Sequence, residues 1–332
     1  MKMKISNSIE KYEITFDKIT QLCGTNISTK SHIINSISKH FSSEKYKEYE
    51  EAYIDNIRLD NEIPGRKQFE CNRVNCINDV INGIQYSKTS ILGKCVKEVI
   101  GQFDCQNELA KIDEILLSIF QRVNNSFFAD EMVELQYTQE DLFGMIQHAS
   151  IRTNEDKDVH TLDNYELIKL YIDLIGKEQE LLPEKRLYIF ENIDHLLARG
   201  EYINVVQYCE SLAEKTNVWF IFATSLDGYI YISENNIEGI NVINDIIFTM
   251  PDLEHLKSFI RENYPIEKEW NNDLIKEHFV DIVQKIGRKD FMLDFSELVI
   301  LKLINDSNLI RETWNSMPKM PEIQCLLDSD MI

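Results

Sequence analysis

The sequence lacks the marks of a membrane or secreted protein. No apolar run in its 332 residues is long enough to cross a bilayer, and the first ten residues contain no apolar core of a signal peptide. With 43% hydrophobic and 27% charged residues, the composition is not that of a disordered chain either. We therefore expect a soluble cytoplasmic protein that has no membrane partner.

The sequence also lacks the residue patterns of metal-dependent and nucleophilic enzymes. Its seven cysteines form no C-x-x-C pair, and the two nearest in sequence, Cys71 and Cys76, have no histidine nearby to complete a zinc site. There is no H-E-x-x-H, no G-x-S-x-G and no H-x-E with a cysteine pair. We expect reduced, mostly buried cysteines and no nucleophilic catalysis.

Positive charge is outnumbered, since 35 lysines and arginines against 56 acidic residues give a net charge of −21. A strongly acidic chain argues against nucleic acid as a partner, because phosphate binding depends on lysine and arginine. Residues 66–97 are the exception, with six basic residues against two acidic ones. Such a segment forms either a local basic stripe that binds a polyanion or a solvated helix face without a ligand. Its basic residues are Arg66, Lys67, Arg73, Lys88, Lys94 and Lys97.

The sequence does contain one stretch that resembles a phosphate-binding loop, residues 24–31. It follows a strand-like apolar run and precedes a helix-like one, which is the context of the G-x-x-x-x-G-K-[ST] motif. Gly24, Lys30 and Ser31 fit the motif, but Thr29 replaces its second glycine. Because a β-branched residue is stiff and tolerates positive φ poorly, we interpret the loop as a nucleotide-binding framework that has lost its nucleotide. The alternative is an ordinary strand-to-helix turn capped by Ser28 or Thr29.

Two later apolar runs predict parallel strands whose ends face this loop. The run 186–191 ends in Glu191, where P-loop proteins place a carboxylate that helps to hold magnesium. The run 218–223 ends in Thr224 and Ser225, and ligands collect at the carboxyl ends of such strands. We therefore predict an α/β fold with a degenerate P-loop NTPase-like sheet domain. In the alternative, Glu191 only happens to lie at the solvent end of a buried strand.

The other segments predict how the chain is divided. Apolar residues at helical spacing between residues 68 and 125 predict a long helical arm that is inserted into the sheet domain. We expect an α/β head of residues 1–65 and 126–264, an inserted helical arm of residues 66–125, and a C-terminal helical extension of residues 265–332.

Residues 126–182 are acidic, with thirteen carboxylates against four basic residues. Asp130, Glu131 and Glu134 cluster where a helix is expected to pass into a strand. Hard cations such as calcium take oxygen ligands without a rigid spacing, so these three residues are candidate metal ligands. The alternative is that they are only solvated.

Taken together, the degenerate loop, the long helical insertion, the strand that ends in Glu191 and the run 218–225 resemble the accessory protein of type II-A CRISPR adaptation modules, in its long variety. The resemblance covers most of the chain and rests on layout and residue character. It implies a homotetrameric ring with a positively lined hole that threads over double-stranded DNA ends, binds calcium where head and arm meet, binds no nucleotide and is not an enzyme. It also implies partners in spacer acquisition: the CRISPR integrase complex and the RNA-guided nuclease.

The resemblance gives the candidate residues their expected roles. The six basic residues of 66–97 become candidates for the hole, and Asp130, Glu131 and Glu134 become candidates for the calcium site. Gly24, Thr29, Lys30, Ser31 and Glu191 become the vestigial nucleotide site. Two alternatives stay open. One is a protein-interaction scaffold of the adaptation complex without a DNA role of its own, and the other is a DNA-linked NTPase that uses Lys30, Ser31 and Glu191.

Overall fold

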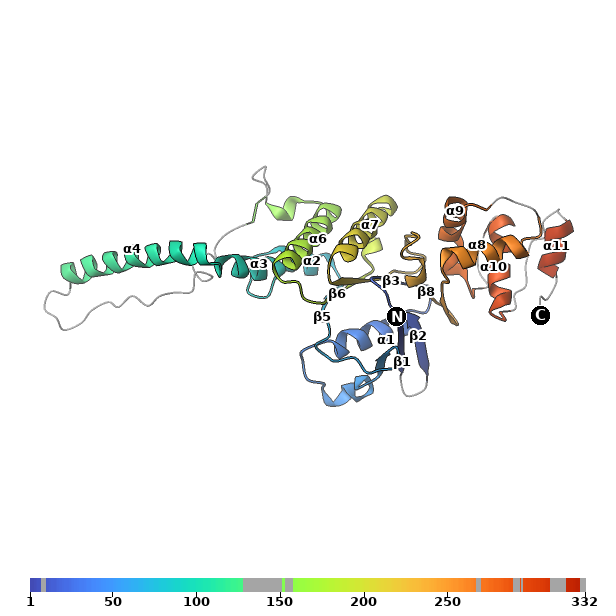
Figure 1. The fold of residues 1–332 in the computed structure, drawn as a ribbon, viewed down its shortest axis with the longest axis horizontal. Helices are drawn as coiled ribbons and strands as arrows, with labels where there is room; N and C mark the ends of the chain where they lie inside the picture. Colours follow the sequence, from blue (N-terminus) through green and yellow to red (C-terminus); the bar gives the residue numbers. More distant parts are fainter. Residues whose placement is uncertain are drawn as a thin grey trace. The chain divides into compact units, whose positions relative to one another are not determined.

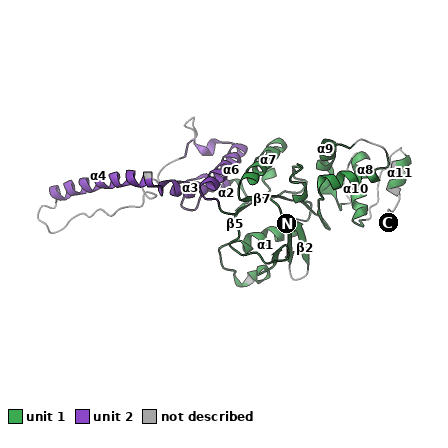
Figure 2. Cartoon of the chain, viewed as in Figure 1, with its two compact units in different colours: residues 1–77, 184–332 green, residues 78–183 purple. Residues whose placement is uncertain are grey.

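The structure is a computed structural model that describes residues 1–6, 10–127, 151–152, 158–266, 270–288, 293, 295–310 and 321–328. The chain forms two compact units (Figure 2). Unit 1 comprises Met1–Ile77 and Glu184–Ile332, and unit 2 comprises Asn78–Pro183. Among the described residues, no helix combines the length and the apolar character that crossing a membrane requires.

A six-stranded sheet with the order β5-β6-β7-β3-β8-β9 forms the centre of unit 1. All neighbouring strands are parallel except β8 and β9. The middle of β6 and all of β7 are apolar because parallel strands are covered on both faces, and both strands confirm the predicted bounds. The strands are β3 (Ile19–Cys23), β5 (Glu70–Val74), β6 (Arg186–Glu191), β7 (Val218–Ala223), β8 (Ile240–Ile243) and β9 (Ile247–Thr249).

Helices cover both faces of this sheet (Figure 1). On one face, the rings of Phe190 and Phe222 stack 5.4 Å apart, and Tyr202 of α7 (Arg199–Lys215) packs edge-on against Phe222. On the other face, Ile189 and Ile221 share a core with α1 (Ile27–His40). The alternation follows from the two-residue period of a strand. The predicted α/β class, with a mostly parallel sheet, is confirmed.

Smaller elements complete unit 1. A three-stranded antiparallel sheet has the order β2-β1-β4, and its Met3 and Ile5 join the α1 core. α8, α9 and α10 share a second core with Val242 of β8. The strands are β1 (Lys2–Ser6), β2 (Lys11–Thr15) and β4 (Ile57–Leu59); the helices are α8 (Leu253–Asn263), α9 (Asn272–Ile282), α10 (Phe295–Ser307) and α11 (Pro321–Asp328); and the short 3₁₀ helices are η1 (Glu48–Tyr53), η3 (Ile193–His195), η4 (Ile237–Gly239) and η5 (Val283–Lys285).

Unit 2 is helical in its described parts. α3 and α6 pack against each other. The Nζ of Lys94 on α3 lies 3.7 Å from the Oε1 of Glu178 on α6, and the Glu178 side chain is fully buried. α4 confirms the long helix that the apolar spacing predicts. The elements are α2 (Ile77–Ile84), α3 (Ile91–Ile100), α4 (Phe103–Phe127), η2 (Val159–Thr161) and α6 (Asn164–Leu181).

The unit boundaries differ from the expected domains. The arm was expected to begin at residue 66, but residues 70–74 form β5, which pairs along its whole length with β6. Pairing with a strand more than a hundred residues away overrides a local pattern that reads as helical. α6, expected in the head, belongs to unit 2, and the C-terminal helices belong to unit 1 together with the sheet.

The Lys94–Glu178 pair predicts a stability effect in unit 2. Lys94→Met removes this cation from the buried Glu178 carboxylate, so we expect the free energy of unfolding to fall by about 3 kcal/mol. Adding Glu178→Gln removes the buried charge as well and restores most of the loss. Urea unfolding measures the change, and hydrogen exchange in α6 localises it. Lys97→Met, at an exposed position of the same helix, is the matched control; an equal loss there would contradict the role of the pair.

Candidate functional site

The candidate site lies at the carboxyl ends of β3, β6 and β7, where the sequence predicts it. A cavity of about 440 Å³ opens there. We call it the strand-end cavity, and its polar lining residues are Lys30, Ser31, Glu191, Asn192, His195, Thr224 and Ser225. The structure therefore brings the loop motif and both predicted strand ends to one place.

The loop that follows β3 requires a glycine at its first position. Gly24 has a φ of +98°, and a Cβ added there would lie 2.5 Å from the carbonyl oxygen of Ile243. The backbone N–H of Thr25 donates to the Oδ1 of Asn244 at 2.7 Å, and that of Asn26 donates to the Ile243 carbonyl at 3.0 Å. Two of the loop's donors are thus bound by its own chain.

α1 begins inside the loop rather than after it. Asn26 is the N-cap, and its side chain accepts a hydrogen bond from the N–H of Thr29 at 3.0 Å. The alternative capping by Ser28 or Thr29 is therefore wrong. Thr29 is buried within the first turn of α1, so its β-branched side chain is compatible with the backbone there. The segment between glycine and lysine is helix, not an open wrap around a phosphate.

Lys30 is turned into the protein. It is only 4% exposed, and its Nζ donates to the carbonyl oxygen of Thr224 at 2.7 Å. Burial lowers the pKa of the Lys30 ammonium, and the nearby Cys23 and Asp194 offset part of that shift. Asp194 is itself bound by the backbone N–H of Ser225 at 3.2 Å and by the Ser225 hydroxyl.

Glu191, the predicted magnesium-side carboxylate, is paired with a cation. The guanidinium of Arg73 donates to both oxygens of Glu191, from Nη2 at 3.0 Å and from Nε, and its Nη1 donates to the Oδ1 of Asn35 at 2.8 Å. A two-pronged pair of this kind is among the stronger hydrogen-bonded ion pairs. The lysine and the carboxylate that a nucleotide and its magnesium would contact are therefore both bound by partners within unit 1.

The six predicted hole residues differ in exposure. Arg66, Arg73 and Lys94 make internal bonds; Arg66, for example, donates to the Ser42 carbonyl at 2.7 Å. Lys67, Lys88 and Lys97 are exposed. The structure also separates the six, because Arg66, Lys67 and Arg73 lie in unit 1 and the other three in unit 2.

The predicted calcium ligands Asp130, Glu131 and Glu134 lie outside the described residues. Within the residues that the structure does describe, no group of three or more His, Cys, Asp or Glu side chains is arranged to hold a metal ion.

The structure adds two features that the sequence analysis missed. The exposed face of the three-stranded sheet carries four basic side chains around a lone Glu13. The alternation of basic and apolar residues in β1 and β2 could have revealed it. No local sequence pattern indicates that Asn244 binds the loop after β3, since its hydrogen bond to Thr25 spans 219 positions. The basic side chains of the face are Lys2, Lys4, Lys11 and Arg58.

Comparison with known proteins places the chain in a family. The model of the family described as CRISPR-associated protein Csn2 subfamily St matches residues 6–306. The crystal structure of Stu0660 of Streptococcus thermophilus has a TM-score of 0.85 at 21% identity and covers 97% of this chain and 98% of that chain, which shows a shared fold. An SMC head domain from Thermotoga maritima reaches a TM-score of only 0.37 at 12% identity, over 75% of this chain and 98% of that chain, and supports no argument.

No curated protein sequence matches the chain. The family model nevertheless covers all but the first five and the last twenty-six residues, and the resemblance drawn from the sequence is confirmed. The chain therefore belongs to the CRISPR-associated protein Csn2 family, subfamily St.

Proposed function

We propose that this protein is a non-catalytic ring that binds double-stranded DNA ends and supports CRISPR spacer acquisition, with calcium as its cofactor. The proposal rests on one observation in a chain of this family: the charged side chains that line the strand-end cavity are bound by partners within the protein. Lys30 binds the Thr224 carbonyl and Glu191 binds Arg73, so the groups that would serve ATP chemistry serve the fold. The same observation supports a degenerate P-loop in preference to an active one.

A threaded ring needs few phosphate contacts. Each lysine or arginine that neutralises a phosphate adds affinity that falls steeply with salt, and in this chain the 35 lysines and arginines are outnumbered by 56 carboxylates, which repel phosphate. A closed ring retains DNA topologically, so a sparse basic lining suffices and no base needs to be read. The exposed Lys67, Lys88 and Lys97 are the candidates for this lining.

Calcium has a physical role in an acidic protein of this kind. Carboxylates that cluster repel one another, and a hard cation with oxygen ligands holds them together. We assign this role to Asp130, Glu131 and Glu134. The expected partners are the integrase complex and the RNA-guided nuclease of the adaptation machinery.

Loading on different DNA forms tests the ring. We expect the purified protein to be retained on linear duplex only when the ends are blocked after loading, to ignore covalently closed circles, and to have the mass of a tetramer in solution. Retention should require calcium. Equal binding to linear and closed DNA would contradict threading, and an oligomer that binds no DNA would favour the scaffold.

Substitution of the three candidate ligands tests the calcium requirement. Asp130→Asn, Glu131→Gln and Glu134→Gln together should abolish the calcium dependence of loading. Glu108→Gln with Glu114→Gln, at exposed acidic positions on α4, removes two carboxylates that are not among the proposed ligands and should leave that dependence intact.

Salt dependence tests the lysines. Lys88→Ala with Lys97→Ala should weaken binding to all duplex sequences alike, and the slope of log K against log salt should fall by about 1 for each lysine that contacts a phosphate. These positions are exposed, so the fold should be unaffected. Lys215→Ala, at an exposed position at the end of α7, is the control. An unchanged slope in the double variant would exclude both lysines from the lining.

Hydrolysis assays test the competing NTPase. We expect no magnesium-dependent ATP hydrolysis above the buffer rate, because Lys30 and Glu191 are engaged elsewhere. Thr29→Gly should not create any, since Thr29 lies in the first turn of α1. If the natural protein hydrolyses ATP and the Ser31→Ala variant does not, the protein is an NTPase instead.

A further inference from the structure

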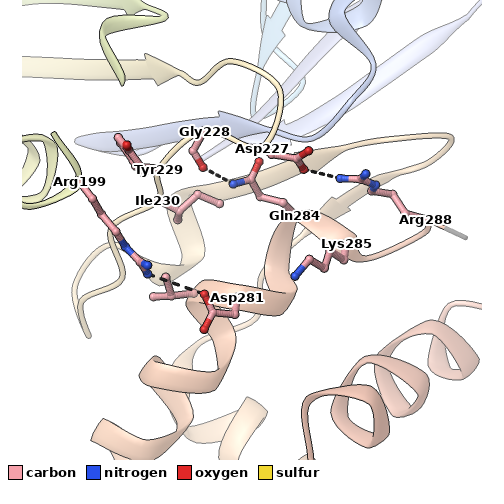
Figure 3. A pocket seen from close by; sticks show the side chains of 10 residues that line it. Arg199, Asp227, Gly228, Tyr229, Ile230, Asp281, Gln284, Lys285 and Arg288 are labelled. Carbon is pink, nitrogen blue, oxygen red and sulfur yellow. Dashed lines mark hydrogen bonds and ion pairs between the residues drawn. The ribbon is translucent and has the colours of Figure 1, made fainter. Parts of the chain in front are cut away.

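A second cavity, of about 370 Å³, lies in unit 1 and shares no lining residue with the strand-end cavity. We call it the α9 cavity. It lies between residues 227–230 and the end of α9 with η5, and Arg199 at the start of α7 and Arg288 also line it (Figure 3). Its volume falls within the range of roughly 300–1,000 Å³ that is usual for small-molecule sites.

Hydrogen bonds and the core fix the walls of the α9 cavity. The Nε2 of Gln284 donates to the carbonyl oxygen of Gly228. The side-chain amide of Asn244 donates to the backbone carbonyls of Gln284 at 3.0 Å and Ile286 at 2.6 Å. Ile230, which lines the cavity, is buried in the same core as α9. The walls of the cavity are therefore held in place by the hydrogen bonds and the core of unit 1.

Positive charge exceeds negative charge around the cavity. Arg199 is 3.8 Å from Asp281, and Arg288 is 2.5 Å from Asp227. Figure 3 shows these two ion pairs and the amine of Lys285 between them. Lys285 has no ion-pair partner within the described residues. On a chain of net charge −21, a cavity with an excess cation indicates an anionic ligand.

Gln284 adds a requirement for a hydrogen-bond donor. Because the Gly228 carbonyl can only accept, the nitrogen of the Gln284 amide must face it, which leaves Oε1 as an acceptor. Oε1 is buried and has no hydrogen-bond partner among the described residues. A buried acceptor without a partner is unfavourable, so a small shift of the lining that lets a ligand hydroxyl or amino group donate to it would be stabilising.

The rest of the lining suits a flat or apolar body. Tyr229, Ile230 and Val280 supply apolar and aromatic surface between the charged residues. A ligand that matches all three features has an anionic group, a hydroxyl or amino donor and a ring that packs on apolar side chains. Free phosphate lacks the ring, and a nucleoside lacks the anionic group.

We propose that the α9 cavity binds a phosphate monoester of the nucleotide type, with its phosphate at Lys285, between the two ion-paired arginines, and its donor at the Oε1 of Gln284. A free nucleoside monophosphate and the 5′-phosphorylated terminus of a DNA strand share this chemistry. The site is separate from the loop at Gly24, so it requires no ATP chemistry there.

Calorimetry on the full chain tests the ligand. Deoxyadenosine 5′-monophosphate should bind at least about tenfold more tightly than deoxyadenosine or inorganic phosphate, because only the nucleotide uses all three features. Lys285→Met should weaken nucleotide binding by about tenfold, as expected for the loss of a charge-assisted hydrogen bond. Lys276→Met, on α9 but outside the cavity lining, should leave it unchanged.

Three results would overturn the proposal: no nucleotide binding at millimolar concentration, equal binding of nucleotide and inorganic phosphate, or equal effects of Lys285→Met and Lys276→Met. Arg199→Met, at an exposed position with only a long ion pair, is a second variant that should also weaken binding if Lys285→Met alters the fold.

Short duplexes with 5′-phosphate or 5′-hydroxyl ends distinguish the two sources. A preference for the 5′-phosphate that Lys285→Met removes identifies the DNA terminus, and a Lys285-dependent signal for the free nucleotide alone identifies the metabolite. The free-nucleotide arm does not depend on ring formation or threading, so the cavity and the proposed DNA role can fail separately.

Discussion

One side chain, Asn244, connects the parts of unit 1 on which the candidate site depends. It is 3% exposed and uses both ends of its amide. Its Oδ1 accepts from the backbone N–H and the hydroxyl of Thr25, and its Nδ2 donates to the carbonyls of Gln284 and Ile286. The loop after β3 and the C-terminal helices therefore share one buried polar link. Because a buried amide that loses its partners is unfavourable, the loop cannot open without disturbing the helices.

The same principle explains the rest of the strand-end cavity. A lysine and a carboxylate at strand ends are free to bind ligands only if the protein leaves them unpaired. Here Lys30 contacts a backbone carbonyl, and Glu191 contacts the guanidinium of Arg73, which is itself fixed by Asn35. Each pairing offsets the desolvation of a charged group, so these residues stabilise the fold. A motif can therefore lie where a nucleotide site is expected without having groups free to bind a nucleotide.

The sequence predicted what depends on local pattern and missed what depends on distant partners. The apolar runs that form β6 and β7 gave correct bounds, and the spacing of apolar residues gave α4, because burial imposes those periods directly. β5 was missed because its five residues are only partly apolar and exist as a strand through pairing with β6. The place of Lys30 and Glu191 could be predicted, but their partners Thr224 and Arg73 could not. Side-chain direction is decided by packing that no short motif encodes.

The internal bonds of three basic residues in segment 66–97 bear on the proposed DNA role. Internal bonds already engage Arg66, Arg73 and Lys94, so the charge of the 66–97 segment overstates what is available to phosphates. A protein that held duplex DNA by charge alone would have to overcome the repulsion between the phosphates and its own excess of carboxylates, given a net charge of −21. Threading removes that requirement, because a ring that cannot dissociate sideways needs only enough cations to make the passage of DNA favourable. The excess of negative charge, which at first argues against DNA, is therefore compatible with a topological mode of binding.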